Sequence, residues 1–159
     1  MRIIAIDPGY ERLGIAIIDK QQNKEVLVFS TCFKTPAKEK PEIRLKMIGD
    51  YLNKLIAEYL PTALAIETLF FKNNAKTAMM VSEARGVILY ECVKAGLPAY
   101  EFTPPEIKAA ITGYGKSDKD NVIFMVDKLI KIKSKPKHDD EYDAIAVGLT
   151  YFATKNSLK

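Results

Sequence analysis

The chain has 159 residues, of which 48% are hydrophobic and 28% charged, and 24 Lys and Arg against 20 Asp and Glu give a net charge of +4. This length fits a single domain over residues 1–159, in which residues from about 155 onward are expected to form a flexible tail. No stretch approaches the roughly 20 apolar residues of a membrane span, and the first residues lack a signal-peptide pattern, so we expect a cytoplasmic protein without a membrane partner.

The first third of the chain predicts three strands. Residues 3–6 are apolar and lead into a turn, so that Asp7 stands at the end of the first strand. Two further apolar runs, residues 13–18 and 26–33, follow after short polar connections. Strands joined by short turns pair antiparallel.

The rest of the chain alternates helical and strand patterns. Apolar residues at helical spacing predict an amphipathic helix over residues 39–59, and the short run 63–66 predicts a fourth strand that ends at Glu67. This order predicts an α/β fold with a mixed five-stranded sheet and helices on both faces. The remaining expected elements are a fifth strand over 97–102 and helices over 74–95, 105–111, 118–130 and 139–154.

Four acidic residues are candidates for one shared site. Asp7 and Glu67 each end an otherwise apolar strand, where a charged side chain gains nothing from burial. Asp140 and Asp143 are three residues apart, so on a helix they project from one face, and an apolar stripe directs this face inward. Taken alone, this pair is explained equally well by the preference for acids at helix N-termini. The conjunction with Asp7 and Glu67 favours a common site.

A set of carboxylate ligands favours Mg²⁺, with Mn²⁺ as the alternative. The wide separation of Cys32 and Cys92 and the presence of one histidine argue against zinc. Four carboxylates suffice for two ions about 4 Å apart, one activating water and one stabilising the leaving oxygen in phosphodiester hydrolysis. Without these four acids, 24 basic residues stand against the 16 acidic residues that remain, a balance that suits a phosphate polyanion.

Aromatic and basic residues close to these acids are candidate DNA contacts. Phe70, Phe71 and Lys72 follow Glu67 closely, and exposed rings can stack on bases, although core packing of one ring is the alternative.

A second group of candidates is basic. Lys108, Lys116 and Lys119 flank a glycine-containing loop, and Lys119 lies in the first turn of a helix whose free amides favour phosphate. Lysines within residues 131–137 are expected to add diffuse attraction to DNA, which ordinary solvated lysines would provide equally. Arg85 could bind DNA, but an arginine inside a helix more often serves structure or an interface.

The chain resembles the RuvC family of bacterial Holliday junction resolvases in four ordered segments, IDPGYERLGIAIID, IETLFFKNNAKTA, SEARGVILYECVKAGLPAYEFTPPEIKAAITGYGKSDKDNV and DDEYDAIAVGLTY. The resemblance covers nearly the whole chain. It implies a ribonuclease H-like fold and a homodimer that uses Mg²⁺ or Mn²⁺ to make paired nicks in opposing strands of four-way DNA junctions, in recombination and DNA repair. It assigns the catalytic, metal-binding carboxylates to Asp7, Glu67, Asp140 and Asp143.

The same resemblance implies further contacts. It favours Phe70 as the ring that inserts at the junction centre, supports Lys108 and Lys119 as backbone or active-site contacts, and suggests the RuvA and RuvB branch-migration machinery as partners. Family members differ in whether the residue three before the last acid is Asp or His. Here that residue is Asp140, and helical geometry places it better than His138, five residues before Asp143. His138 is then either a residue that supports the site from outside the ligand set or an exposed loop residue.

Two other functions compete with a nuclease. A noncatalytic nucleic-acid-binding module on the same fold would keep the lysines and aromatic residues but need not keep four converging acids. An actin-like ATPase or sugar kinase is less favoured: the sequence around Asp7, Pro8, Gly9 and Gly14 resembles its phosphate loop, but these enzymes have two lobes and a second glycine loop.

Overall fold

The computed structural model of the chain describes residues 1–22, 24–69, 75–132 and 135–156. Its five strands form one sheet in the order β3-β2-β1-β4-β5. The first three strands pair antiparallel, whereas β4 pairs parallel to β1 and β5 parallel to β4, which confirms the predicted mixed sheet. The strands are β1 Arg2–Asp7, β2 Arg12–Gln21, β3 Lys24–Lys34, β4 Leu64–Glu67 and β5 Ala99–Phe102.

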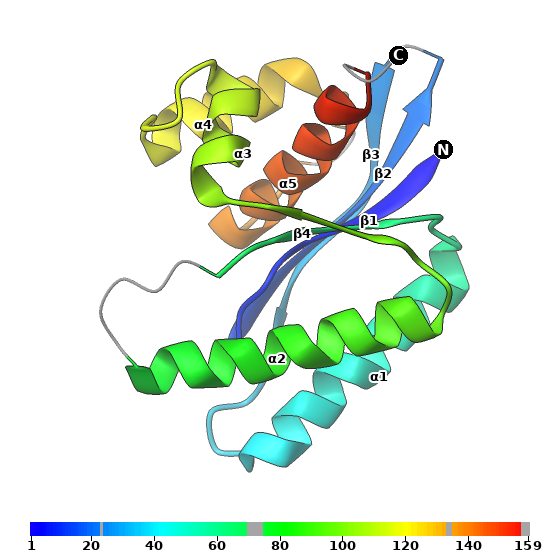
Figure 1. The fold of residues 1–159 in the computed structure, drawn as a ribbon, viewed down its shortest axis with the longest axis vertical. Coiled ribbons are helices and arrows are strands. Elements are labelled where there is room, and N and C mark those ends of the chain that lie inside the picture. Colours follow the sequence, from blue (N-terminus) through cyan, green and yellow to red (C-terminus); the bar gives the residue numbers. More distant parts are fainter. Residues whose placement is uncertain (23, 70–74, 133–134, 157–159) are drawn as a thin grey trace.

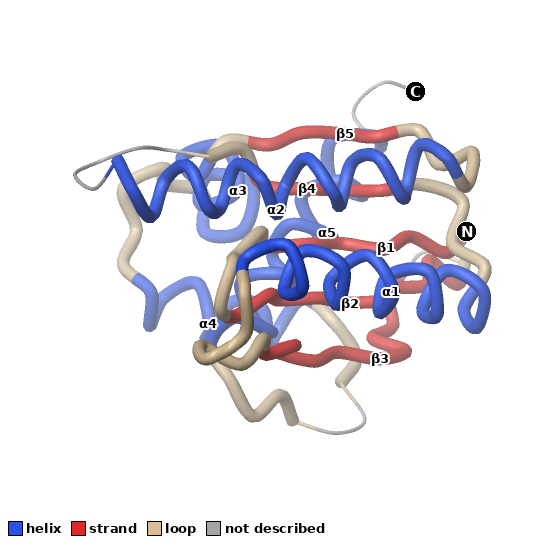
Figure 2. Tube along the Cα trace, turned by 90° about the horizontal axis from the view of Figure 1, so that it is seen from below, coloured by secondary structure: helices blue, strands red, loops and turns tan. Residues whose placement is uncertain are grey.

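Helices cover both faces of the sheet, as predicted. Figure 2 shows α1 and α2 together on one side of the strands, and Figure 1 shows α3, α4 and α5 grouped on the other. The helices are α1 Pro41–Tyr59, α2 Ala75–Lys94, α3 Pro104–Thr112, α4 Lys119–Leu129 and α5 Asp139–Asn156.

The central strand β1 is buried on both faces. Successive side chains of a strand point to opposite sides, so Ile4 and Ile6 pack with α1 and α2, whereas Ile3 and Ala5 pack with α5. Helix α5 lies very close to the sheet, because a Cβ at Gly148 would be only 2.6 Å from Ile18 and 3.0 Å from Ala5. The small residues at this contact fix the depth at which α5 docks.

Local signals explain where α3 and α4 begin. Thr103 caps α3 and forms a capping box with Glu106, and proline occupies the first turn. Asp118 caps α4 by accepting a hydrogen bond from the backbone of Asn121. These caps fix the starts of the two helices that stand beside α5.

The last helix continues beyond its predicted end at residue 154. It includes Lys155 and Asn156, so two residues of the expected tail are helical, and residues 157–159 lie outside the described residues. Among the helices that the structure describes, none combines the length and apolar character needed to cross a membrane.

Candidate active site

The parallel pairing of β1 and β4 places two acids side by side. Ile6 pairs with Ile66, so the next residues, Asp7 and Glu67, leave the two strands at the same edge of the sheet. Their carboxyl groups are close enough to share a hydrogen bond. The carboxyl ends of strands are where open α/β sheets usually place their sites.

Helix α5 brings Asp140 and Asp143 to the same edge. Gly14 stands between Asp7 and Cys32 in the strand pairing, and the backbone of Asp140 lies directly on it. A Cβ at Gly14 would overlap the carbonyl oxygen of Asp140, so only glycine admits this close approach. The first turn of α5 therefore reaches the end of β1, where the four acids meet.

The carboxylates influence one another strongly. Burial, followed by the negative charges of Glu67, Asp143 and Asp140, raises the pKa of Asp7 well above its usual range. Burial also raises the pKa of Glu67, against the opposing effects of its hydrogen bond with Asp7 and of the charge on Lys108. Asp7 and Glu67 therefore hold a proton between them more readily than isolated acids would.

Lys119 neutralises one side of the cluster. Its Nζ lies 3.3 Å from an oxygen of Asp143 and 3.3 Å from an oxygen of Asp139. Burial raises the pKa of Asp143 in spite of this ammonium group. Glu67, Lys108, Lys119 and Asp143 together line a pocket of about 190 Å³. This pocket offers two acids and two cationic side chains to a ligand.

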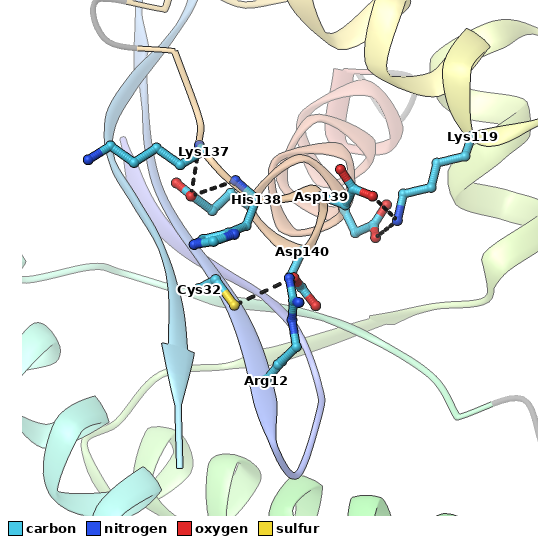
Figure 3. Close-up of polar contacts among 9 residues, drawn as sticks. Arg12, Cys32, Lys119, Lys137, His138, Asp139 and Asp140 are labelled. Carbon is cyan, nitrogen blue, oxygen red and sulfur yellow. Dashed lines mark hydrogen bonds and ion pairs between the residues drawn. The ribbon is translucent and has the colours of Figure 1, made fainter. Parts of the chain in front are cut away.

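Asp140 is held from a different direction. Arg12 at the start of β2 donates from Nε and from Nη2 to the same oxygen, Oδ2, and Cys32 of β3 lies 3.5 Å from it through Sγ. Figure 3 shows Lys119 and Cys32 on opposite sides of the start of α5. Burial disfavours the charge on Asp140, but the hydrogen bonds from Arg12, from the backbone and from Cys32, together with the charge on Arg12, outweigh burial and lower the pKa of Asp140.

The donor set suits a hard divalent cation. Four carboxylates of like charge meet at one edge of the sheet, and burial together with the neighbouring negative charges raises the pKa of Asp7, a combination that a bound cation would relieve. In the described part of the chain, however, no three His, Cys, Asp or Glu side chains are gathered tightly enough to hold one ion together. Two of these acids are instead engaged by basic side chains, Asp143 by Lys119 and Asp140 by Arg12.

The predicted DNA contacts fall into two groups. Lys108 and Lys119 both line the pocket beside Glu67, whereas Lys116 is exposed on the loop between α3 and α4. Arg85 of α2 is paired with Glu101 of β5, as a structural arginine would be. The remaining candidates, Phe70, Phe71 and Lys72, lie outside the described residues.

His138 is half-buried and turns toward β3 rather than toward Glu67. It lines a second pocket, of about 420 Å³, with Cys32 and Glu141. Glu141 is buried there and accepts hydrogen bonds from Ser30 and from the backbone of Lys137 and His138. This geometry favours Asp140 over His138 as the residue that completes the carboxylate cluster.

Three partners of the acids did not stand out in the sequence. Arg12 and Cys32 both contact Asp140, and Asp139 shares Lys119 with Asp143. Arg12 directly follows the turn after Asp7, but nothing in the local pattern marks it, because its partner lies 128 residues away.

Comparison with known proteins identifies relatives over nearly the full chain. The model of the family "Crossover junction endodeoxyribonuclease RuvC" matches residues 3–151. A protein of that name from Finegoldia magna is 42% identical over 151 residues, which is 95% of this chain and 92% of the relative. The one from Thermosipho melanesiensis is 46% identical over 147 residues, or 92% of this chain and 94% of the relative.

A solved structure agrees with these relatives. Thermus thermophilus RuvC in complex with a Holliday junction substrate matches with a TM-score of 0.91 and 29% identity, covering 99% of this chain and 96% of that chain. The likeness therefore extends over the sheet and over the helices on both of its faces.

Proposed function

The chain belongs to the RuvC family of crossover junction endodeoxyribonucleases and has its ribonuclease H-like fold, and we propose that it resolves four-way (Holliday) DNA junctions. It cuts opposing strands by paired symmetric nicks, through phosphodiester hydrolysis, during recombination and repair. Asp7, Glu67, Asp140 and Asp143 carry the reaction.

One observation supports this assignment most directly. Two parallel strands and one helix, far apart in the sequence, deliver four acids to one edge of the sheet, and two lysines line the pocket beside them. Buried like charges are unfavourable unless they are compensated, so an arrangement of this kind suits a site that binds cations.

The proposed cofactor is Mg²⁺, with Mn²⁺ as the alternative, held as two ions by the four carboxylates. When bound, such ions activate water and stabilise the leaving oxygen of a phosphodiester. Lys119 and Lys108 are then placed to bind the phosphate oxygens of the strand being cut. Lys116 extends the basic surface outward, where backbone phosphates supply most of the affinity.

The competing functions explain fewer of these features. A noncatalytic binding module would have no use for Asp7 and Glu67, two buried acids whose pKa values burial raises. A phosphotransferase loop would need Gly14 to face a phosphate, but Gly14 lies against the backbone of Asp140.

Paired nicks in opposing strands need two carboxylate clusters, and each chain supplies one. We propose that a second copy of the chain docks on α2, whose outer face exposes Met79, Tyr90 and Val93. These residues recur at helical spacing, with Gly86 between them and open space around it. An exposed apolar stripe of this kind is typical of an interface.

The wider setting follows from the family. The RuvA and RuvB branch-migration proteins are the expected partners, and the cytoplasm is the expected location.

A cleavage assay tests the proposal. A synthetic four-way junction and a linear duplex of the same sequence are incubated with the protein, with and without Mg²⁺. We expect cutting of the junction alone, and only with Mg²⁺. Asp7→Asn removes a buried negative charge and a ligand, so it should abolish cutting while a gel-shift assay still detects junction binding.

Asp50→Asn provides the matched control, because Asp50 is an exposed acid of α1 paired with Lys46. It should cut like the wild type. Junction cutting by Asp7→Asn in Mg²⁺ at the wild-type rate would refute the assignment of the site.

A further inference from the structure

The contact between Arg12 and Asp140 differs from an ordinary arginine–carboxylate pair. Arg2 and Asp19 form the usual fork, in which Nε binds Oδ1 at 2.8 Å and Nη2 binds Oδ2 at 3.0 Å. Arg12 instead directs both donors at Oδ2 of Asp140, and Cys32 adds a third donor to that oxygen. No described side chain donates a hydrogen bond to the other oxygen, Oδ1.

Arg12 makes these contacts from the surface. About half of its side chain is exposed, whereas the side chain of Asp140 is 21% exposed. The described groups that act on the Arg12 guanidinium are Asp140 and Cys32, and Arg12 takes no part in either apolar layer of the core. Its charge therefore serves the carboxylate cluster rather than the fold.

We propose that Arg12 is a built-in competitor of the divalent cation at Asp140. It occupies Oδ2 and places a fixed positive charge beside the cluster, so that an ion reaching Asp140 must displace the guanidinium or share the carboxylate with it. Arg12 thereby sets the metal concentration at which the site becomes active. This inference rests on the proposed metal-dependent function.

The spacing of the acids supports the competition. Asp140 and Asp143 are each engaged by a basic side chain, and no three acids in the described residues are close enough to hold one ion. Drawing Asp140 toward Asp7 therefore opposes the contacts with Arg12. Removing Arg12 frees Asp140 and leaves the cluster with one more uncompensated negative charge.

Metal titration of the whole protein tests this idea. The affinity for Mn²⁺ and for Mg²⁺ is measured by calorimetry for the wild type, Arg12→Gln and Arg12→Lys. We expect Arg12→Gln to bind about tenfold more tightly. The Mg²⁺ concentration for half-maximal junction cutting should fall by a similar factor. Arg12→Lys keeps the charge and should stay near the wild type.

Arg2→Gln is the matched control, because it removes an arginine–carboxylate pair that joins β1 to β2 at the opposite end of these strands from Asp7. Its metal affinity should not change. A loss of folding weakens metal binding, so tighter binding cannot arise from damage to the fold. The proposal would be overturned if Arg12→Gln bound the metal as tightly as the wild type or less tightly. It would also be overturned if Arg12→Lys bound the metal more tightly than the wild type, to the same degree as Arg12→Gln.

The same titration separates this inference from the function on which it rests. Asp7→Asn is titrated in parallel. If the wild type binds Mn²⁺ no better than Asp7→Asn does, the proposed metal site fails. If the wild type binds Mn²⁺ more tightly but Arg12→Gln matches the wild type, only the role of Arg12 is refuted.

Discussion

Lys119 is the cationic side chain most directly engaged with the acids. Burial works against its charge, but Asp143 and Asp139 outweigh burial and raise its pKa, so it remains protonated across the neutral range. A fixed positive charge at this position can stabilise the negative charge that develops on phosphate oxygens during cleavage.

Lys119→Gln should therefore slow junction cutting by about 10²-fold. Junction binding should weaken much less, because many other phosphate contacts remain. Single-turnover cutting rates and gel-shift affinities measure the two effects separately. Lys128→Gln, at the other end of the same helix, is the control and should leave both quantities unchanged. Equal losses in binding and cutting would show that Lys119 only holds DNA.

The pair of Arg2 and Asp19 predicts a dependence of stability on pH. The hydrogen bonds from Arg2 lower the pKa of Asp19, whose side chain is 15% exposed. A lowered pKa in the folded state contributes stability above the unfolded pKa of about 3.9, which is lost as the pH falls through the folded value. Asp19→Asn should cost about 1 kcal/mol at pH 7.

Denaturant unfolding of the wild type and Asp19→Asn between pH 7 and pH 3 measures this difference in free energy. The difference should shrink as the solution becomes more acidic. A difference that stays constant down to pH 3 would contradict the lowered pKa.

The common location of the four acids could be predicted from the sequence, because Asp7 and Glu67 end apolar strands and Asp143 continues an inward helical face. The contact of Arg12 and Cys32 with Asp140 could not. It joins three elements, and it depends on the strand pairing that sets Cys32 opposite Gly14 and on the depth at which α5 docks. Neither quantity has a local signature in the sequence.

The docking of α5 on β2 depends on a missing side chain. In Gly14→Ala the new methyl group would overlap the carbonyl oxygen of Asp140. The backbones of β2 and α5 can relieve this overlap only if α5 shifts. We expect a loss of about 1–3 kcal/mol in stability, together with a severe loss of junction cutting, because Asp140 and Asp143 move with the helix.

Gly49→Ala in α1 is the matched control for this change. Its new methyl group would lie 3.4 Å from the nearest atom, on Val87, which is ordinary contact. Chemical unfolding and the cleavage assay should show little change. Retention of wild-type cutting by Gly14→Ala would refute the role of this close approach.

The helices and strands were predicted nearly to their ends, because each has a clear apolar period and most are bounded by proline, glycine or a cap. The antiparallel start of the sheet also followed from its short turns. The order of β4 and β5 beyond β1 could not be predicted from the sequence, because strand order depends on how α1 and α2 pack across the sheet. Gly14 carried no signal for its role, since it also resembled part of a phosphate loop.

The assembled molecule is expected to be a dimer through α2. Tyr90→Glu places a charge within the exposed stripe and should shift the protein to a monomer in light scattering. On a symmetric junction it should nick single strands without coordinating the two cuts. Phe124→Glu, an exposed aromatic residue of α4, should remain dimeric. A wild-type protein that is fully active as a monomer would contradict the proposed pairing.

The dependence of the site on α5 has a consequence for the newborn protein. A ribosome makes Asp7 and Glu67 early, but α5 comes last among the described elements. A growing chain therefore emerges with two of the four proposed metal ligands and with one face of its sheet bare. Ribosome-bound chains halted before residue 139 should show no junction cutting in a translation assay. Because α5 comes last, only a nearly complete chain can bring the four acids together.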